Sequence, residues 1–460
     1  AASDVYKRQQ ALCIGGMALM AVSCDYTDLQ PTDQIGDEMI FSSVSALKQT
    51  VTGAYAQMSA KQIIRVTAVL SDDVIKGGQN GGAGDDTYQW TYTASTGEHA
   101  DIWSKEYNVI NQVNRILKGA ESVEATTDEE VASKNNSIAT AKFLRAYNSL
   151  ELLLLFSDIE KADSYGIPYV KEPVVLETPG RNTVGECFDY MIQDLTDARP
   201  LLRQAAPDDP VYVSQTAVDA LLARIYLYKK DYGKAYQYAD AVLQQKSFAT
   251  MGEYTDIWSD KSNADIIWKL KRAVGEETIG TIFWGADNSS SFEAAPELIN
   301  SYLADDIRLN LFIADGVDRD GVAVKKVNKY KGTEANVGLA DGKMLRSSEM
   351  QLIKAEAIAY TDLDKANVLL NDLRRERISG WVDQNYGTLD EFMEELLLER
   401  RRELCYEGHR FFDMRRFGKS LYKPVIKKTL EAGNYRWLMP IPLGELQGNS
   451  VIAKQQNPGY

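Results

Sequence analysis

Paired helical segments with alanine at their contact positions constrain the fold of this chain more than any other feature. The clearest pair lies at 214–243, where apolar residues recur every three or four positions on both sides of Asp231. Helical periodicity of the same kind recurs at 141–156 and 346–374. One such pair cannot bury its apolar face alone, so it must stack on neighbouring pairs. The sequence therefore predicts a body dominated by α-helices.

Length and composition fit one folded body. The chain has 460 residues, of which 44% are hydrophobic and 25% are charged, which is ordinary for a folded protein with a soluble surface. Stacked helical repeats of this length can form a single continuous domain. The formal net charge is -15 and no basic run is interleaved with aromatic residues, so no nucleic-acid partner is expected. Neutral glycans and peptides stay open as ligands.

Residues that could carry catalysis are scarce. The only histidines are His99 and His409, and the sequence contains no HExxH, GxSxG, GxxxxGK[ST] or helix-opening GxGxxG motif. The acidic residues at 315–321 have the wrong spacing for an EF-hand loop and no closing Glu, which favours a solvated turn. We therefore expect no enzyme activity, no cofactor and no metal. A glycoside hydrolase is an alternative that would need two carboxylates converging in a cleft.

The N-terminus has the layout of a lipoprotein signal. Lys7 and Arg8 precede an apolar run at 11–22, and small residues lead to Cys24. A dozen apolar residues are too few for a permanent membrane span. We predict a signal peptide at 1–23, lipid attachment at Cys24 and a tether at 24–42 leading to one domain at 43–460. The alternative is an ordinary secretory signal in which Cys24 is incidental.

The other cysteines fit that arrangement. Cys13 leaves with the predicted signal, which leaves Cys187 and Cys405, each in an apolar helical context. We interpret these two as buried small hydrophobic residues rather than as a disulfide or a metal site.

Two glycine-containing loops carry the aromatic residues that we predict to contact a ligand. Five glycines between Gly77 and Gly84 predict a loop, and three aromatic residues follow it at alternate positions. The C–H face of a sugar ring packs on an aromatic ring, while amides and carboxylates bind its hydroxyls. A Gly and a run of Ser and Asn flank Trp284, so we expect it to be exposed. The predicted ligand contacts are Asp73, Tyr88, Trp90, Tyr92, Trp284 and Phe292.

A structural role is the alternative for each loop. Tyr88 to Tyr92 would then be a short strand with alternate side chains held in the body. Trp284 would fill the seam between the loops and the repeats.

The C-terminal region, 389–460, contains a charged amphipathic helix. Glu399, Arg400 and Glu403 recur at helical spacing beside an apolar stripe, and Gly408 offers a stop. Glu and Arg three or four residues apart can meet on such a helix and reach its neighbours. We interpret this helix as a structural charge network rather than a catalytic centre.

Two linked motifs in this region resemble a known family. The run from Glu399 to Gly418 resembles the ERRREL–EGHRFFDLRRFG signature of the SusD/RagB family, the outer-membrane nutrient-binding lipoproteins of Bacteroidetes. Trp437 to Glu445 and Asn457 to Tyr460 resemble that family's ending. The helix at 100–119 resembles its W–Y–I–N–N helix, in which aromatic residues such as Trp103 are chiefly structural.

The resemblance implies a fold and a role. The fold would be an all-α-dominated SusD-like body with tetratricopeptide-like repeats, long irregular ligand-binding loops and a few short strands. The repeats would pack on a SusC-like TonB-dependent transporter, and the loops would hold an oligosaccharide or polysaccharide. The protein would face the cell exterior on the outer membrane. A peptide ligand, as for RagB, and a purely structural assembly subunit are alternatives.

Overall fold

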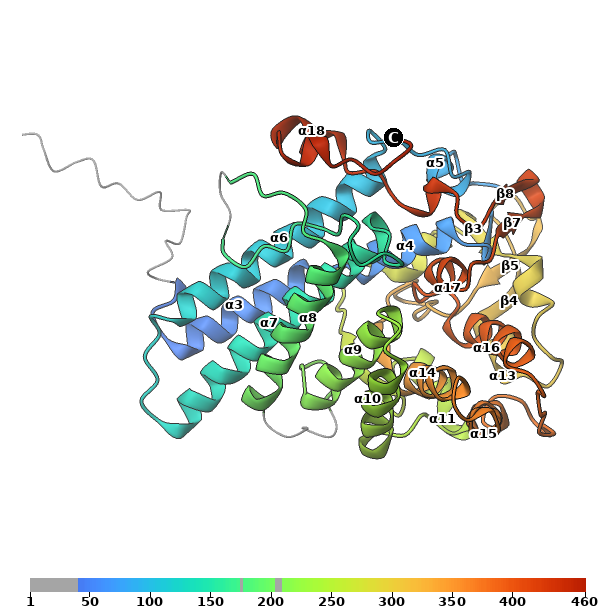
Figure 1. The fold of residues 1–460 in the computed structure, drawn as a ribbon. Coiled ribbons are helices and arrows are strands. Elements are labelled where there is room, and N and C mark those ends of the chain that lie inside the picture. The colour runs from blue at the N-terminus through green and yellow to red at the C-terminus, as the bar shows by residue number, and fades with distance from the viewer. Residues whose placement is uncertain (1–39, 174–176, 203–208) are drawn as a thin grey trace, which may run out of the picture.

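The computed structural model describes residues 40–173, 177–202 and 209–460. Helices dominate this part of the chain, and its strands pair into four two-stranded sheets, which confirms the predicted fold class (Figure 1). Three N-terminal predictions lie wholly or almost wholly outside the described residues: the signal peptide 1–23, lipid attachment at Cys24 and the tether 24–42.

Three long helices form one side of the molecule (Figure 1). These are α3 (Val44–Gln57), α6 (Gly97–Ala120) and α7 (Asp128–Phe156), and each packs on the other two. Helix α7 begins earlier than the predicted 141–156. Thr127 caps it by accepting from the Glu130 backbone N–H, while the Glu130 carboxylate accepts from the Thr127 N–H, so the helix starts in a polar stretch that hydrophobic periodicity does not mark.

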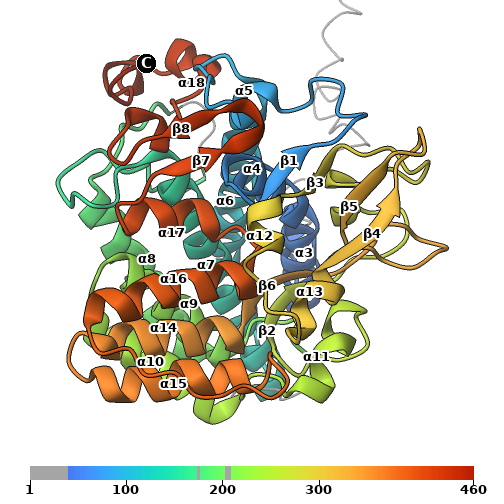
Figure 2. The same ribbon diagram turned by 90° about the vertical axis from the view of Figure 1, so that its right-hand side faces the viewer.

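The helices of two predicted repeat segments, 214–243 and 346–374, form a stack with neighbouring helices, in which each packs on the next (Figure 2). Asp231 and Asp362 begin two of them by accepting backbone N–H groups from Lys234 and Lys365. The stack confirms the helices predicted at 214–243 and 346–374. Its members are α8 (Val184–Ala198), α9 (Gln215–Tyr228), α10 (Tyr232–Gln245), α14 (Ser347–Ala359), α15 (Leu363–Arg375) and α16 (Leu389–Leu404).

Short elements complete the fold and join segments that are distant in sequence. The shorter helices are α4 (Ala60–Leu70), α5 (Asp85–Tyr88), α11 (Met251–Trp258), α12 (Pro296–Ile299), α13 (Ile307–Phe312), α17 (Arg410–Arg416) and α18 (Leu443–Gly448). The antiparallel strand pairs are β1 (Val74–Lys76) with β3 (Phe292–Ala294), β2 (Ile266–Leu270) with β6 (Gly342–Arg346), β4 (Ile313–Val317) with β5 (Ala323–Val327), and β7 (Leu421–Lys423) with β8 (Lys428–Leu430).

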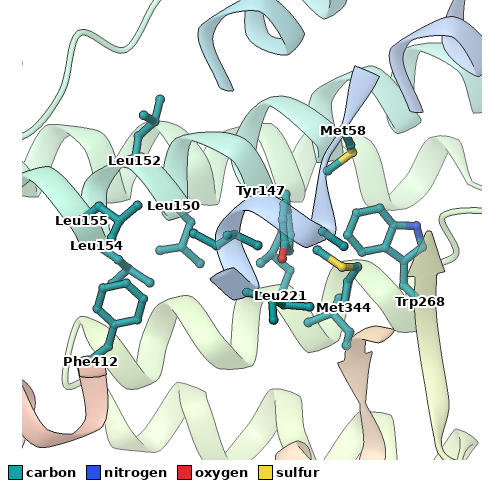
Figure 3. Close-up of a cluster of buried hydrophobic side chains, with 14 of the residues drawn as sticks. Met58, Tyr147, Leu150, Leu152, Leu154, Leu155, Leu221, Trp268, Met344 and Phe412 are labelled. Carbon is teal, nitrogen blue, oxygen red and sulfur yellow. The ribbon is translucent and has the colours of Figure 1, made fainter. Parts of the chain in front are cut away.

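One large apolar cluster runs through the body and contains residues from Phe41 to Ile452. Its centre is shown in Figure 3, where side chains of α7 and α9 meet Trp268 and Met344 from the β2–β6 pair. Trp268 is fully buried, and the rings of Phe143 and Tyr147 approach it edge-on at 4.9 and 5.0 Å between centroids. Such close packing of aromatic groups fixes the repeats against the strands. The domain boundary at residue 43 stays a prediction.

The charged face of α16 is a buried ion network, as predicted. Glu403 is fully buried and accepts from Arg308 (3.1 Å), Arg346 (2.9 Å) and Arg377 (3.0 Å). Burial raises the pKa of the neighbouring Glu399 carboxyl, but the surrounding guanidinium groups outweigh burial and lower that pKa to about 2. Carboxylates held this strongly stay ionised and fix α16 on its neighbours.

The two described cysteines are free and buried, as expected. The Cys187 thiol donates to the Ile167 carbonyl (3.4 Å). Burial raises the pKa of the Cys405 thiol to about 11, so it stays protonated at neutral pH. Both act as small core residues.

Candidate functional site

Three loop segments meet beside the β1–β3 pair and form a polar surface, here called the loop face: 77–84, 284–291 and 318–321. Gln79 joins all three. Its backbone N–H donates to the Ser290 carbonyl (3.0 Å), and its side-chain oxygen accepts from the Ser290 N–H (2.8 Å). Its side-chain amide donates to Asp318 and Asp320 (2.9 Å each). The predicted glycine-rich loop therefore exists, and its course is fixed by hydrogen bonds.

The aromatic residues after this loop point into the body. Tyr88 and Tyr92 are fully buried and Trp90 is 4% exposed. The Trp90 indole N–H donates to the Leu70 carbonyl (2.9 Å), and the Lys423 ammonium lies 4.5 Å from the centroid of its ring. The expectation of exposed rings is wrong here. The alternative is correct in that the three rings are held in the body, but the segment is not a strand, because Tyr88 ends the short helix α5 and Trp90 has a left-handed backbone conformation (φ 53).

Trp284 and Phe292 are buried as well. Trp284 is 7% exposed, and the ammonium of Lys326, from β5, lies 4.4 Å from the centroid of its ring. Phe292 on β3 is fully buried, with its ring centroid 6.5 Å from that of Tyr88. The expected exposure of Trp284 is therefore wrong. A glycine-rich loop gives little apolar cover, so large rings gain more free energy, about 1.5–3 kcal/mol each, by turning inward.

Asp73 has a structural partner. Its carboxylate is 1% exposed and lies 2.8 Å from the Arg401 guanidinium on α16. The neighbouring Asp72 pairs with Arg410 at 2.8 Å. These pairs hold the start of β1 on the C-terminal helices. Whether any of the six predicted residues contacts a ligand stays a prediction.

A solvent-open cavity of about 250 Å³ lies along α6 and is here called the α6 cavity. Trp103 and Tyr107 form its aromatic wall, with 4.8 Å between their ring centroids. Pro168 and Pro179 line it as well and add apolar surface. Tyr107 is half-buried, so its ring and the prolines can offer flat apolar contact to the C–H face of a small ligand, whereas Trp103 is buried behind this surface.

Amides and carboxylates also line the α6 cavity. Asn108 is exposed on the lining, and Asn111 lies one turn from Tyr107. Glu177 is exposed on the lining, while Glu445 accepts the Trp103 indole N–H (3.2 Å). Amides can donate to and accept from hydroxyl groups, and carboxylates can accept from them. This combination suits a neutral, polyhydroxylated ligand.

The wall of the α6 cavity is held rigidly. Asn114 donates its amide to the Val170 carbonyl (2.9 Å) and accepts from Arg145 (2.9 Å), which in turn pairs with Asp194 (2.6 Å). The Tyr107 hydroxyl donates to the Pro168 carbonyl (2.9 Å). These bonds tie α6, α7 and α8 to the segment at 168–170, so the aromatic wall is pre-organised.

Sequence reasoning missed this cavity because it assigned the helix at 100–119 to the core. That interpretation is correct for Trp103, which is 5% exposed. The overlooked signal is the amide ladder of Asn108, Asn111 and Asn114 on the face that carries Tyr107. Asparagine is a weak helix former, so three of them on one helical face indicate a polar role.

The described residues hold neither a cluster of metal-binding side chains nor a helix that could span a membrane. No group of three or more His, Cys, Asp or Glu side chains is arranged there to hold a metal ion. Among the same residues, every helix is too short or too polar to cross a lipid bilayer.

Two family models together match nearly the whole chain, and a known protein is similar to it over almost its full length. A family model described as "Starch-binding associating with outer membrane" matches residues 25–227, and one described as "SusD family" matches 224–460. The SusD-like protein P2 of Formosa agariphila is 23% identical over 509 residues, covering 96% of this chain and 98% of that relative.

Solved structures give the same fold. A SusD superfamily protein of Bacteroides thetaiotaomicron superimposes with a TM-score of 0.78 at 23% identity, covering 90% of this chain and 100% of that one. A SusD-like carbohydrate binding protein of Bacteroides vulgatus has a TM-score of 0.76 at 20% identity, covering 90% and 98%.

Proposed function

This chain belongs to the SusD family, and from that premise we propose that it captures a glycan at the cell surface and passes it unchanged to a SusC-like TonB-dependent transporter. The α6 cavity carries the proposal, because it places an aromatic wall beside amides and carboxylates. Its volume of about 250 Å³ is below the roughly 300–1,000 Å³ of pockets for drug-sized ligands. One or two sugar rings of a longer chain are therefore the fitting occupant.

Attachment and delivery rest on other features. The family model for the N-terminal half describes association with the outer membrane. Lipid on Cys24 would hold the protein there, since two or more acyl chains together anchor a protein stably to a membrane. The repeat stack from α8 to α16 offers a rigid helical surface for the transporter. Binding without turnover fits the absence of hydrolase motifs in the sequence.

Binding to neutral polysaccharides tests the proposal. The protein lacking residues 1–24 is run through gels containing starch, xylan, galactan or fructan, and a retarding glycan is then titrated by calorimetry as an oligosaccharide. Asn108→Trp places an indole in the α6 cavity from an exposed position, and we expect it to weaken binding at least tenfold. Lys105→Trp is the matched control, because Lys105 is exposed on α6 but does not line the cavity.

Three results would count against the proposal. Equal binding by Asn108→Trp and the parent protein would remove the α6 cavity from the site. Binding of a peptide mixture but of no glycan would replace the glycan with a peptide, and release of sugars from a bound glycan would make the protein an enzyme. Trp284→Ala tests the predicted contact of Trp284 in the same assay, and a loss below threefold in affinity would remove that residue from the site.

A further inference from the structure

A second cavity, of about 240 Å³, opens between α3, α7 and the end of β2. It is here called the α3 cavity, and it shares no lining residue with the α6 cavity. Its floor includes Tyr55, whose hydroxyl accepts from the Val213 backbone N–H (3.3 Å). Burial raises the pKa of the Tyr55 hydroxyl, so this hydroxyl stays uncharged at neutral pH.

Two unpaired lysines set the charge of the α3 cavity. Lys48 and Lys271 line it and are exposed, and neither ammonium forms an ion pair with any residue in the described ranges. The other cations on the lining are already neutralised by carboxylates: Lys269 by Asp341 (2.8 Å) and Arg272 by Glu277 (2.6 Å).

One carboxylate on the lining does not cancel this charge. Glu276 accepts from the Ala273 backbone N–H (2.8 Å) within its own turn. The cavity therefore keeps one net positive charge, on a chain whose formal net charge is -15. A local field opposite in sign to that of the whole molecule draws anions to this one place.

The remaining lining of the α3 cavity has the features of a sugar site. Tyr212 is 56% exposed at the cavity and offers an open ring face. Thr52 and Asn136 line the cavity and are not fully buried, so their hydroxyl and amide can bond to hydroxyl groups. A ring face, hydrogen-bonding side chains and two free ammonium groups together fit a sugar that carries a negative charge.

We propose that the α3 cavity binds a carboxylate-bearing sugar residue of an acidic glycan, with Lys48 and Lys271 pairing with the carboxylate and Tyr212 covering the ring. The proposal rests on the proposed glycan-binding function and adds a charge preference to it. The α6 cavity cannot supply this preference, because Glu177 and Glu445 on its lining repel an anion. The two cavities would then hold neutral and acidic parts of a glycan separately.

Calorimetry with a pair of matched probes tests this proposal. The probes are tetragalacturonate and its methyl ester, in which each carboxylate loses its charge and gains a methyl group. We expect tetragalacturonate to bind and the ester to bind at least fivefold more weakly, at low ionic strength where charge pairs are least screened. The Lys48→Gln, Lys271→Gln double variant should lose about fivefold or more in affinity for tetragalacturonate, as two solvent-exposed ion pairs would give.

Lys331→Gln is the control for the loss of a lysine charge. Lys331 is exposed, lies outside both cavities and forms no ion pair with any described residue. This variant should bind tetragalacturonate like the parent protein. The proposal is overturned if the parent protein does not bind tetragalacturonate, if the ester binds equally well, or if the double variant binds as the parent does. If the protein still binds a neutral glycan when one of these results is obtained, the proposed function stands and only the proposal for the α3 cavity fails. The two outcomes can therefore be told apart.

Discussion

At the scale of single residues, His99 couples the stability of the fold to pH. It is 1% exposed, and neither ring nitrogen has a hydrogen-bond partner among the described residues. Burial lowers its pKa to about 4, against a smaller opposing effect of Glu98. The unfolded chain therefore binds the proton more tightly, and stability falls as pH drops from about 6.5 toward 4.

Replacing His99 by phenylalanine should remove this dependence. The ring can keep its edge-on contact with Tyr92, at 4.6 Å between centroids in the parent protein. Between pH 7 and pH 4.5, we expect the variant to lose about 2 kcal/mol less of its free energy of unfolding than the parent, as measured by urea titration at both pH values. If both proteins lose the same free energy of unfolding between these pH values, His99 does not cause the dependence of stability on pH.

At the scale of elements, helix α16 depends on the charge of Glu403. Its carboxylate meets three guanidinium groups and accepts from the Tyr254 hydroxyl (2.8 Å). Glu403→Gln keeps the shape but removes the carboxylate that pairs with Arg377 and one of the carboxylates around Arg308 and Arg346, so positive charge in the interior is less well compensated. We expect a loss of about 3 kcal/mol or more in the free energy of unfolding.

A second variant on the same helix controls for the loss of a negative charge. Glu394 is exposed on α16 and pairs with Lys419. Glu394→Gln should change the free energy of unfolding by less than about 0.5 kcal/mol, because exposed ion pairs contribute little. If the two variants unfold at the same urea concentration, the buried network does not hold α16.

At the scale of the whole molecule, hydrogen bonds connect the C-terminal residues to the end of helix α7. Asn457 is 5% exposed, and its amide donates to the carbonyls of Phe156 at the end of α7 (2.7 Å) and Met439 (2.6 Å). Its oxygen accepts from Arg181 (2.8 Å). Asn457→Ala removes these three buried hydrogen bonds, so we expect a loss of about 2–3 kcal/mol in the free energy of unfolding.

Hydrogen exchange locates the effect of Asn457→Ala. Amides at the end of α7 should exchange faster, although they lie some 300 positions earlier in the chain. Ser450→Ala, at an exposed position in the same C-terminal region, should leave both stability and exchange unchanged. A loss below 1 kcal/mol for Asn457→Ala would show that the chain end is only loosely attached.

Periodicity predicted the repeat helices, since the apolar faces of α9, α10, α14 and α15 recur with the helical period. The charge network of α16 could be predicted for a similar reason. The orientation of rings such as Trp90 and Trp284 could not, because it depends on partners such as Lys423 and Lys326, more than forty residues away. The asparagines of α6 indicate a polar face but do not predict the α6 cavity, since it forms only where α6 meets Pro168, Glu177 and Pro179.

The hydrogen bonds between Gln79 and Ser290 also affect which residues of the loop face can change during evolution. Two of the contacts that hold the loop face use backbone groups: Gly77 donates to the Ser291 carbonyl (3.0 Å) and Gln79 to that of Ser290 (3.0 Å). Backbone groups are the same whichever side chains the loop carries. Mutation can therefore exchange exposed residues such as Ala83, Asp86 and Asp287 while the loops keep their course. Descendants of one ancestral gene can thus acquire new preferences without rebuilding the helices beneath.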